Sequence, residues 1–291
     1  MKKCIALTLA LLLLAGCAPA AYDGPTESVW VLTEDSTTFY MRDTGEAETS
    51  LDINSYDRFG NLVRTVSYSN GELDCENQYV YDDQGNCIRE VYWEYFWFLR
   101  YPVKRCRHTY DDQYRLLSTT YRNGLGIKTG EDTYTYDDEA NTLTWDGIYD
   151  HQITYFAENG DILRTETYST PSGIKMESVY EYDELGRSIR ETEYMNGEIY
   201  VVTEFHWDNQ HHLTELTSRD SNGAVLNRTT YVYEENIVTS WDEMGYKYVE
   251  SLRPDNQLEW DEVYDPQGNL FRRNDYTYTE IQIPAERRDA P

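Results

Sequence analysis

The stretch Tyr180-Glu181-Tyr182-Asp183-Glu184-Leu185-Gly186-Arg187, followed by Asn196-Gly197, decides the fold of this 291-residue chain. Two aromatic residues two positions apart lie on one face of a strand, because successive side chains of a strand alternate between its faces. Asp183 and Gly186 mark a tight turn, and Asn196-Gly197 fits a two-residue hairpin turn of type I′. The segment therefore predicts a β-hairpin bounded by two kinds of turn.

Copies of this segment recur along the chain, which is the signature of a repeat architecture. Clear copies begin at Tyr56, Tyr81, Tyr182 and Tyr264, and weaker ones at Tyr110, Tyr136, Tyr155, Trp207 and Tyr233. These nine starts are about 26 residues apart, and Asn-Gly turns follow about halfway, at Asn70-Gly71, Asn123-Gly124, Asn196-Gly197 and Asn222-Gly223. The runs between the turns are rich in β-branched and aromatic residues, so each repeat is predicted to contain two antiparallel strands.

The aromatic doublets explain how so acidic a chain could fold. They are Tyr79/Tyr81, Tyr134/Tyr136, Tyr180/Tyr182, Phe205/Trp207 and Tyr231/Tyr233. Stacked repeats are expected to align these rings into aromatic ladders, and each buried ring removes about 150–250 Å² from water.

The pattern from Tyr180 to Arg187, with Ile189 and Asn196-Gly197 after it, resembles the YD repeat of the RHS-repeat proteins. The resemblance covers roughly residues 50–280 and implies long antiparallel ribbons that spiral. Nine units are expected to be too few to close a shell. We therefore expect an all-β fold, an elongated antiparallel meander or solenoid of repeated hairpins, forming one domain over residues 29–291.

The N-terminus resembles a bacterial lipoprotein signal. Lys2 and Lys3 precede an apolar run over residues 5–15, and Leu14-Ala15-Gly16-Cys17 resembles a lipobox. The resemblance implies cleavage after residue 16, acylation of Cys17 and a membrane-anchored, extracytoplasmic protein. Residues 17–28, with Pro19, Gly24 and Pro25, are predicted to form a tether.

The charge balance excludes one class of partner. The chain has 25 Lys+Arg and 53 Asp+Glu, a net charge of −28, which becomes −30 once residues 1–16 and their two lysines are removed. Binding to nucleic acid needs Lys and Arg to displace the counterions of the phosphates. We therefore expect no nucleic acid partner, and an anchor that depends on the lipid.

Three cysteines remain in the mature body, Cys75, Cys87 and Cys106, so at most one disulfide can form. Cys87 and Cys106 flank an apolar hairpin and could face each other, or all three could remain buried thiols. No Cys/His pair has the sequence spacing of a zinc site. Acidic turns such as Asp82-Asp83 could bind calcium, but Asp also favours turns by bonding its own backbone. No metal or cofactor is expected.

One segment breaks the repeat: residues 92–101 hold seven aromatic residues in ten, and basic residues follow. Because a strand cannot bury both its faces against one layer, either a second layer covers this hairpin, or it associates with another copy, or an apolar patch is exposed for binding. Aromatic rings beside arginine suit a carbohydrate or an anionic ligand. The candidate ligand-binding residues are Trp93, Tyr95, Phe96, Trp97, Arg100, Arg105 and Arg107.

These features favour a non-enzymatic, lipid-anchored cell-surface protein that presents a β surface to a glycan or a protein. No catalytic motif is present in the sequence. Two alternatives stay open: an extracytoplasmic carbohydrate-active hydrolase with its site near residues 92–107, and an immunity or scaffold partner of a toxin, which the family resemblance alone implies.

Overall fold

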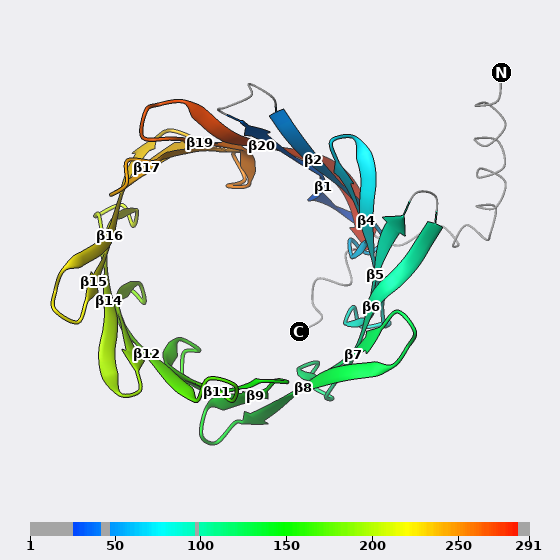
Figure 1. The fold of residues 1–291 in the computed structure, drawn as a ribbon, viewed down its shortest axis with the longest axis horizontal. Coiled ribbons are helices and arrows are strands. Elements are labelled where there is room, and N and C mark those ends of the chain that lie inside the picture. The colour runs from blue at the N-terminus through cyan, green and yellow to red at the C-terminus, as the bar shows by residue number, and fades with distance from the viewer. Residues whose placement is uncertain (1–25, 42–46, 97–98, 285–291) are drawn as a thin grey trace.

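A computed structural model describes residues 26–41, 47–96 and 99–284, in which all regular structure is strand. The sheet has 20 strands, and every pairing in it is antiparallel. Viewed down the shortest axis, the strands follow one another around a ring (Figure 1). No helix in the described ranges is long and apolar enough to cross a membrane.

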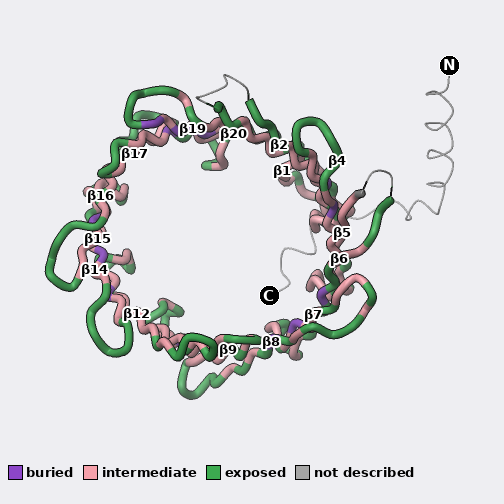
Figure 2. The backbone as a smooth tube through the Cα atoms, viewed as in Figure 1, coloured by how far each residue is buried: buried purple, intermediate pink, exposed green. Residues whose placement is uncertain are grey.

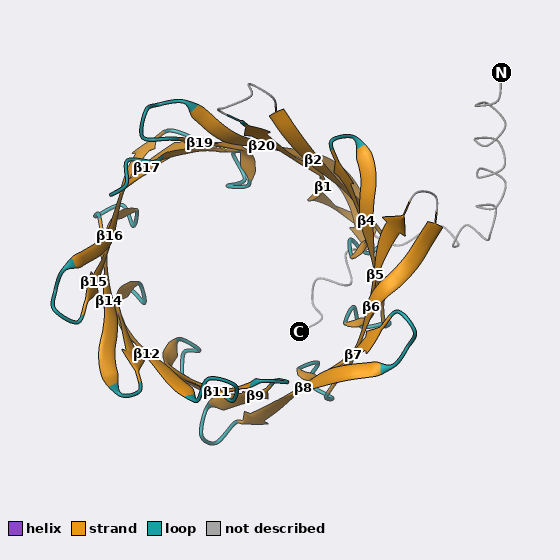
Figure 3. Ribbon diagram, viewed as in Figure 1, coloured by secondary structure: helices purple, strands orange, loops and turns teal. Residues whose placement is uncertain are grey.

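Strands in the first half of the ring are β1 (Thr26–Tyr40), β2 (Ala47–Tyr56), β3 (Leu62–Ser69), β4 (Glu72–Tyr81), β5 (Cys87–Phe96), β6 (Leu99–Tyr110), β7 (Leu116–Asn123), β8 (Lys128–Asp137), β9 (Thr142–Asp146) and β10 (Asp150–Phe156). The second half contains β11 (Ile162–Ser169), β12 (Ile174–Tyr182), β13 (Ser188–Met195), β14 (Glu198–Trp207), β15 (Leu213–Asp220), β16 (Val225–Glu234), β17 (Ile237–Asp242), β18 (Lys247–Leu252), β19 (Leu258–Tyr264) and β20 (Leu270–Pro284). Figure 3 shows these strands joined by short loops.

The sheet closes on itself through its first strand. Each strand from β2 to β19 pairs with the next along the chain, and β1 pairs with both β2 and β20. The closing register runs from Thr26 opposite Pro284 to Phe39 opposite Arg272, with one irregularity between Leu32 and Glu34. A closed ring has no edge strand, so every strand is paired on both sides.

The structure corrects four expectations. The all-β, antiparallel hairpin architecture is confirmed, but the elongated open solenoid is wrong, and with it the resemblance to RHS/YD repeat proteins, because the sheet forms a closed 20-stranded barrel. The expectation that nine units are too few to close is wrong for the same reason. Strand β1 begins at Thr26, so the last three residues of the predicted tether, 26–28, belong to the barrel.

The acidic turns are held by their own aspartates. In the turn after β12, Asp183 Oδ1 accepts hydrogen bonds from the backbone nitrogens of Leu185 at 2.9 Å and Arg187 at 3.0 Å, while Gly186 adopts a φ of 77°. The same arrangement recurs at Asp57, Asp82, Asp111, Asp208, Asp220 and Asp265. These carboxylates cap their turns, so their repetition follows from backbone chemistry.

The predicted Asn-Gly turns form at two of the four positions. Asn70-Gly71 and Asn196-Gly197 both have positive φ at each residue, as type I′ requires. At residues 222–223 only Gly223 has positive φ. Gly124 lies outside the left-handed region; instead, a Cβ there would come within 1.8 Å of the Pro102 carbonyl oxygen, so glycine permits a close approach between two hairpins.

The aromatic doublets tie the two strands of a hairpin together rather than forming continuous ladders. In four of the five doublets the second ring donates a hydrogen bond to a backbone carbonyl at the start of the preceding, paired strand: Tyr81 to Leu62, Tyr136 to Leu116, Tyr182 to Ile162 and Trp207 to Ser188, at 2.8–3.2 Å. Ring-to-ring contacts in the described ranges join Phe39 to Phe271 and His212 to Tyr233, neither of which links two doublets. The repeated tyrosine is therefore explained by a polar anchor as well as by burial.

The single-layered wall leaves little fully buried volume. Buried apolar side chains in the described ranges are Val66, Cys106, Val249 and Val263, and most of the wall is half-buried (Figure 2). Buried polar residues are more frequent than buried apolar ones, and Glu76, Thr217 and Ser251 are the most enclosed of them. No second layer of described residues covers the aromatic hairpin, so its side chains lie on the two faces of one sheet.

Candidate functional site

The strand register separates the aromatic hairpin into two faces. Residues directly opposite each other in a sheet share a face, and so do alternate residues along one strand. Val66 is opposite Glu76 and Glu76 is opposite Trp93, which places Trp93 and Tyr95 on the side that we call the Glu76 face. Tyr92, opposite Asn77, lies on the reverse face. This is the alternation expected of any strand.

A buried carboxylate organises the Glu76 face. The Glu76 side chain is 1% exposed and accepts hydrogen bonds from Arg64 Nε at 2.7 Å, Gln78 Nε2 at 2.8 Å and Arg100 at 3.0 Å. Tyr95 donates its hydroxyl to the other carboxylate oxygen. The guanidinium of Arg100 also covers the ring of Trp93, 4.1 Å from its centroid. Three predicted site residues, Trp93, Tyr95 and Arg100, therefore belong to one network.

This network keeps Glu76 ionised. Burial alone would raise the pKa of the carboxyl group, but hydrogen bonds from Arg64, Tyr95 and Gln78 outweigh it and hold the pKa below the ordinary value of 4.5. A carboxylate with these donors is satisfied, and it fixes the positions of Arg100 and Tyr95. Glu76 is therefore an ionised structural centre of the site.

Beside this network, a cluster of arginines crosses three strands. Arg89 on β5 is directly opposite Arg107 on β6, and Arg105 on β6 is directly opposite Arg122 on β7. All four side chains are exposed and lie on the Glu76 face. We call these four residues the arginine patch.

The arginine patch lacks nearby acidic partners. Within the described ranges, Arg89, Arg105 and Arg107 make no side-chain ion pair. The next acidic group in the row of Arg89 and Arg107 is Glu131, which binds Lys128 at 2.9 Å. Like charges directly opposite in a sheet are destabilising. The strands therefore maintain an uncompensated positive surface within a chain of net charge −28.

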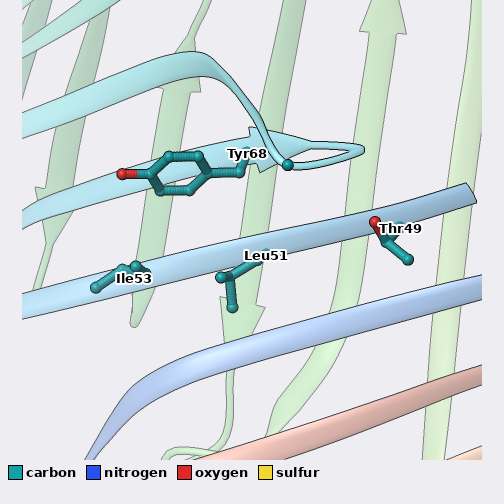
Figure 4. A pocket seen from close by; sticks show the side chains of 5 residues that line it. Thr49, Leu51, Ile53 and Tyr68 are labelled. Carbon is teal, nitrogen blue, oxygen red and sulfur yellow. The ribbon is translucent and has the colours of Figure 1, made fainter. Parts of the chain in front are cut away.

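An apolar pocket of about 280 Å³ lies on the same face, on the other side of the Glu76 network. Its lining residues are Thr49, Leu51, Ile53, Tyr68 and Gly71. Figure 4 shows Leu51 and Ile53 along one strand and Tyr68 on its neighbour. Tyr68 is opposite Leu51, and Ile53 is opposite Val66, so the pocket and the Glu76 network share adjoining rows. Tyr68 thus offers an aromatic ring beside an apolar surface.

The structure brings together most of the predicted ligand residues. Trp93, Tyr95, Arg100, Arg105 and Arg107 all lie on the Glu76 face. Phe96 is the last residue of β5, and its side chain lies outside the described part of the structure, as does all of Trp97. Because Arg100 covers one face of the Trp93 ring, that ring is less open to stacking than the sequence suggests.

Sequence reasoning missed Glu76, Arg89, Arg122 and Tyr68. None of them lies within the aromatic segment 92–101, and only the strand register places them beside the predicted residues. The alternation of side chains along a strand did offer a signal for the arginine patch. Arg89, Arg105 and Arg107 are predicted to share one face once the position of the turn between β5 and β6 is known.

The cysteines do not form the disulfide that the sequence allowed. Cys75, Cys87 and Cys106 are free thiols, Cys106 buried and the other two half-buried. Cys106 is directly opposite Glu90, whereas Cys87 is opposite Tyr81 on β4. The two thiols therefore belong to different cross-strand pairs. The predicted lipidation residue, Cys17, lies outside the described residues.

Comparison with known proteins gives low similarity throughout. No family model and no curated protein matches the sequence. A porin-like protein from Bacteroides uniformis aligns over 85% of this chain and 98% of its own, with 9% identity and a TM-score of 0.42. A porin-like protein from Bacteroides vulgatus gives 13% identity and a TM-score of 0.23 over 85% of this chain and 98% of its own.

A third similarity is to the complex TcdB2-TccC3 without its hypervariable C-terminal region. It covers 87% of this chain but 18% of that one, with 10% identity and a TM-score of 0.34. Scores below 0.5 do not establish a common fold, and the barrel is defined by its own strand pairing.

Proposed function

We propose that this protein is a lipid-anchored, extracytoplasmic, non-enzymatic barrel that binds an acidic polysaccharide at the arginine patch. The observation that carries this proposal is the exposed Arg89 directly opposite the exposed Arg107, without an ion-pair partner for either among the described residues. Such a pair opposes folding. An anionic ligand across the two guanidinium groups would compensate it.

The chemistry of arginine favours carboxylate or sulfate groups as ligands. A guanidinium presents a planar fork of donors that binds an oxyanion through two hydrogen bonds. Neighbouring strands are about 4.8 Å apart, so the patch presents positive charge over about 10 Å across β5, β6 and β7. A polymer with regularly spaced anionic groups can contact several arginines at once, while the acidic remainder of the barrel repels it elsewhere.

The neighbouring surface suits the sugar rings of such a polymer. Sugars pack their apolar faces on aromatic rings, and Tyr68 lies beside Leu51 and Ile53 in the 280 Å³ pocket. Between this pocket and the arginine patch, the Glu76 network holds Arg100 in a fixed position. A chain-like ligand can therefore extend from β3 to β7 along one face.

The sequence supports the anchor. In Leu14-Ala15-Gly16-Cys17 the proposed acylated residue is separated from β1 in the sequence by residues 18–25. A chain of that length spans at most about 30 Å. Mass spectrometry of the mature N-terminus should show acylated Cys17, and an unmodified start further along the chain would refute the anchor.

Binding is tested with a matched pair of double variants in the full chain. R89Q/R107Q removes two charges from the patch, and R190Q/R219Q removes two from distant strands, so the net charge is equal. We expect the Kd for polygalacturonate to rise at least tenfold, about 1.4 kcal/mol, in R89Q/R107Q alone. Neutral dextran should not bind, and added salt should weaken binding. Equal losses in both variants, or no binding by the wild type, would refute the proposal.

A further inference from the structure

The reverse face of the same hairpin carries a second cluster, made by Cys87, Glu90 and His108. Each residue offers one ligand atom, and the three atoms lie within 4.8 Å of one another. They are the Cys87 sulfur, a Glu90 carboxylate oxygen and a His108 ring nitrogen. Cys87 and Glu90 come from β5 and His108 from β6. These residues are separate from the Glu76 network, since Glu90 is opposite Tyr79 and Cys106 on the other side of the sheet.

The contact between His108 and Glu90 is closer to a metal-ligand spacing than to a hydrogen bond. His108 Nε2 is 3.4 Å from Glu90 Oε1, and this nitrogen is buried without a hydrogen-bond partner among the described residues. Zinc bonds to histidine nitrogen and carboxylate oxygen are about 2.0–2.2 Å long and tetrahedrally arranged. Two such ligands are then about 3.4 Å apart, which is the spacing found.

A second contact orients the imidazole. His108 Nδ1 is 3.0 Å from the hydroxyl oxygen of Thr119, a residue 5% exposed on β7. When the hydrogen is on Nδ1, this nitrogen donates to Thr119 and leaves the lone pair of Nε2 directed at the cluster. Histidines that bind metals are oriented in this way by a partner of their other nitrogen.

We propose that Cys87, Glu90 and His108 bind one Zn²⁺ ion. Thiolate and imidazole are ligands that zinc prefers over hard oxygen donors, and the thiolate and carboxylate charges together balance the charge of the ion. The fourth coordination position is left for water. This site is independent of the proposed polysaccharide binding.

A cysteine nucleophile is the rival explanation of the same three residues, and the electrostatics oppose it. The Cys87 sulfur has a carboxylate as its neighbour, since a Glu90 carboxylate oxygen lies within 4.8 Å of it. Reactive cysteines have a lowered pKa and a positive surrounding. A bound cation would change these surroundings, because a thiol that coordinates a metal ion releases its proton to solvent.

The test uses the full chain, stripped of metal with a chelator and titrated with Zn²⁺ or Co²⁺. We expect one ion per chain, and in the cobalt form a sulfur-to-metal charge-transfer band together with the strong visible bands of tetrahedral Co²⁺. Cys87→Ser should abolish the charge-transfer band, whereas the control Cys75→Ser should keep it. Thr119→Val should weaken Zn²⁺ affinity about 10- to 100-fold.

One measurement needs no variant and so does not depend on the folding of any. Saturating Zn²⁺ should protect Cys87, but not Cys75, from alkylation, as read by peptide mass spectrometry. Absence of stoichiometric binding, or equal alkylation of Cys87 with and without Zn²⁺, would overturn the proposal. A charge-transfer band that persists in Cys87→Ser would overturn it as well.

Discussion

Replacing Glu76 by alanine tests the centre of the Glu76 face. The substitution removes the acceptor of four hydrogen bonds, from Arg64, Gln78, Tyr95 and Arg100. It also releases the Arg100 guanidinium from its position above Trp93. We therefore expect lower stability and a less ordered site in the same variant.

The expected loss of stability depends on how exposed the hydrogen-bond donors of Glu76 are. Removing one partner of a buried ion pair costs about 3–5 kcal/mol when the other charge stays buried. Here the Arg64 and Arg100 side chains are 47% and 36% exposed and regain hydration, so the cost falls to the lower end. We expect Glu76→Ala to reduce the free energy of unfolding by about 3 kcal/mol, and Glu76→Gln, which keeps an acceptor, by about half as much.

The pH dependence of the stability provides a second, independent test of the role of Glu76. The folded pKa of Glu76 lies below its ordinary value of 4.5, because the hydrogen bonds outweigh burial. The stability that the carboxylate adds is therefore present above about pH 4.5 and is lost as the pH falls through the folded pKa. The difference between wild type and Glu76→Ala should shrink over that range.

Urea unfolding followed by tryptophan fluorescence measures these differences. Glu94→Ala is the control, since Glu94 accepts a hydrogen bond from the exposed Tyr101 on the reverse face and should cost about 0.5 kcal/mol or less. A loss below 1 kcal/mol in Glu76→Ala, or a difference from wild type that does not change on acidification, would refute the reasoning.

Four further outcomes are expected. Arg89→Gln should raise the free energy of unfolding by about 0.2–1 kcal/mol in urea, because it removes the repulsion from Arg107; a loss would contradict the assigned register. Tyr81→Phe should lower the free energy of unfolding by about 1 kcal/mol, because the hydrogen bond to the Leu62 carbonyl is lost; an unchanged urea midpoint would contradict a stabilising role for this bond. Gly124→Ala should lower the melting temperature, because its Cβ would meet the Pro102 carbonyl oxygen at 1.8 Å; an unchanged melting temperature would mean that the two hairpins separate easily. The pKa of Asp82 is lowered by hydrogen bonds from Asn86, Gln84 and Gly85, which outweigh burial, so its stabilising effect should disappear as the pH falls below about 3.8; NMR titration of this carboxyl group would show a normal pKa if the turn were open.

The sequence predicted the local structure well because local rules determine it. Asp183 and Gly186 specify their turn through hydrogen bonds within a few residues, and Asn196-Gly197 specifies its hairpin. Closure of the sheet into a barrel could not be predicted from such local signals. It depends on pairing between Thr26 and Pro284 at opposite ends of the described chain, and the residues of β1 carry none of the repeat signals that mark the other strands.

The site was predicted in part for a similar reason. The unusual density of aromatic residues pointed to Trp93 and Tyr95, but Glu76 belongs to an ordinary-looking strand and is identified by its burial. The proposed zinc ligands were missed because spacing rules describe ligands on one local segment. Cys87 and His108 come together through the pairing of β5 with β6, which no spacing rule describes.

The pairing of β1 with β20 also determines when the barrel can close during synthesis of the chain. Joining two chain ends this far apart costs about 5 kcal/mol of chain entropy, which the long register from Thr26–Pro284 to Phe39–Arg272 offsets. Until β20 has been synthesised, β1 and the growing C-terminal end both expose unpaired backbone groups, and such edges pair readily between molecules. The last strand therefore has to be complete before the barrel can close and be protected from aggregation, and a chain truncated within β20 should assemble with its neighbours instead of closing.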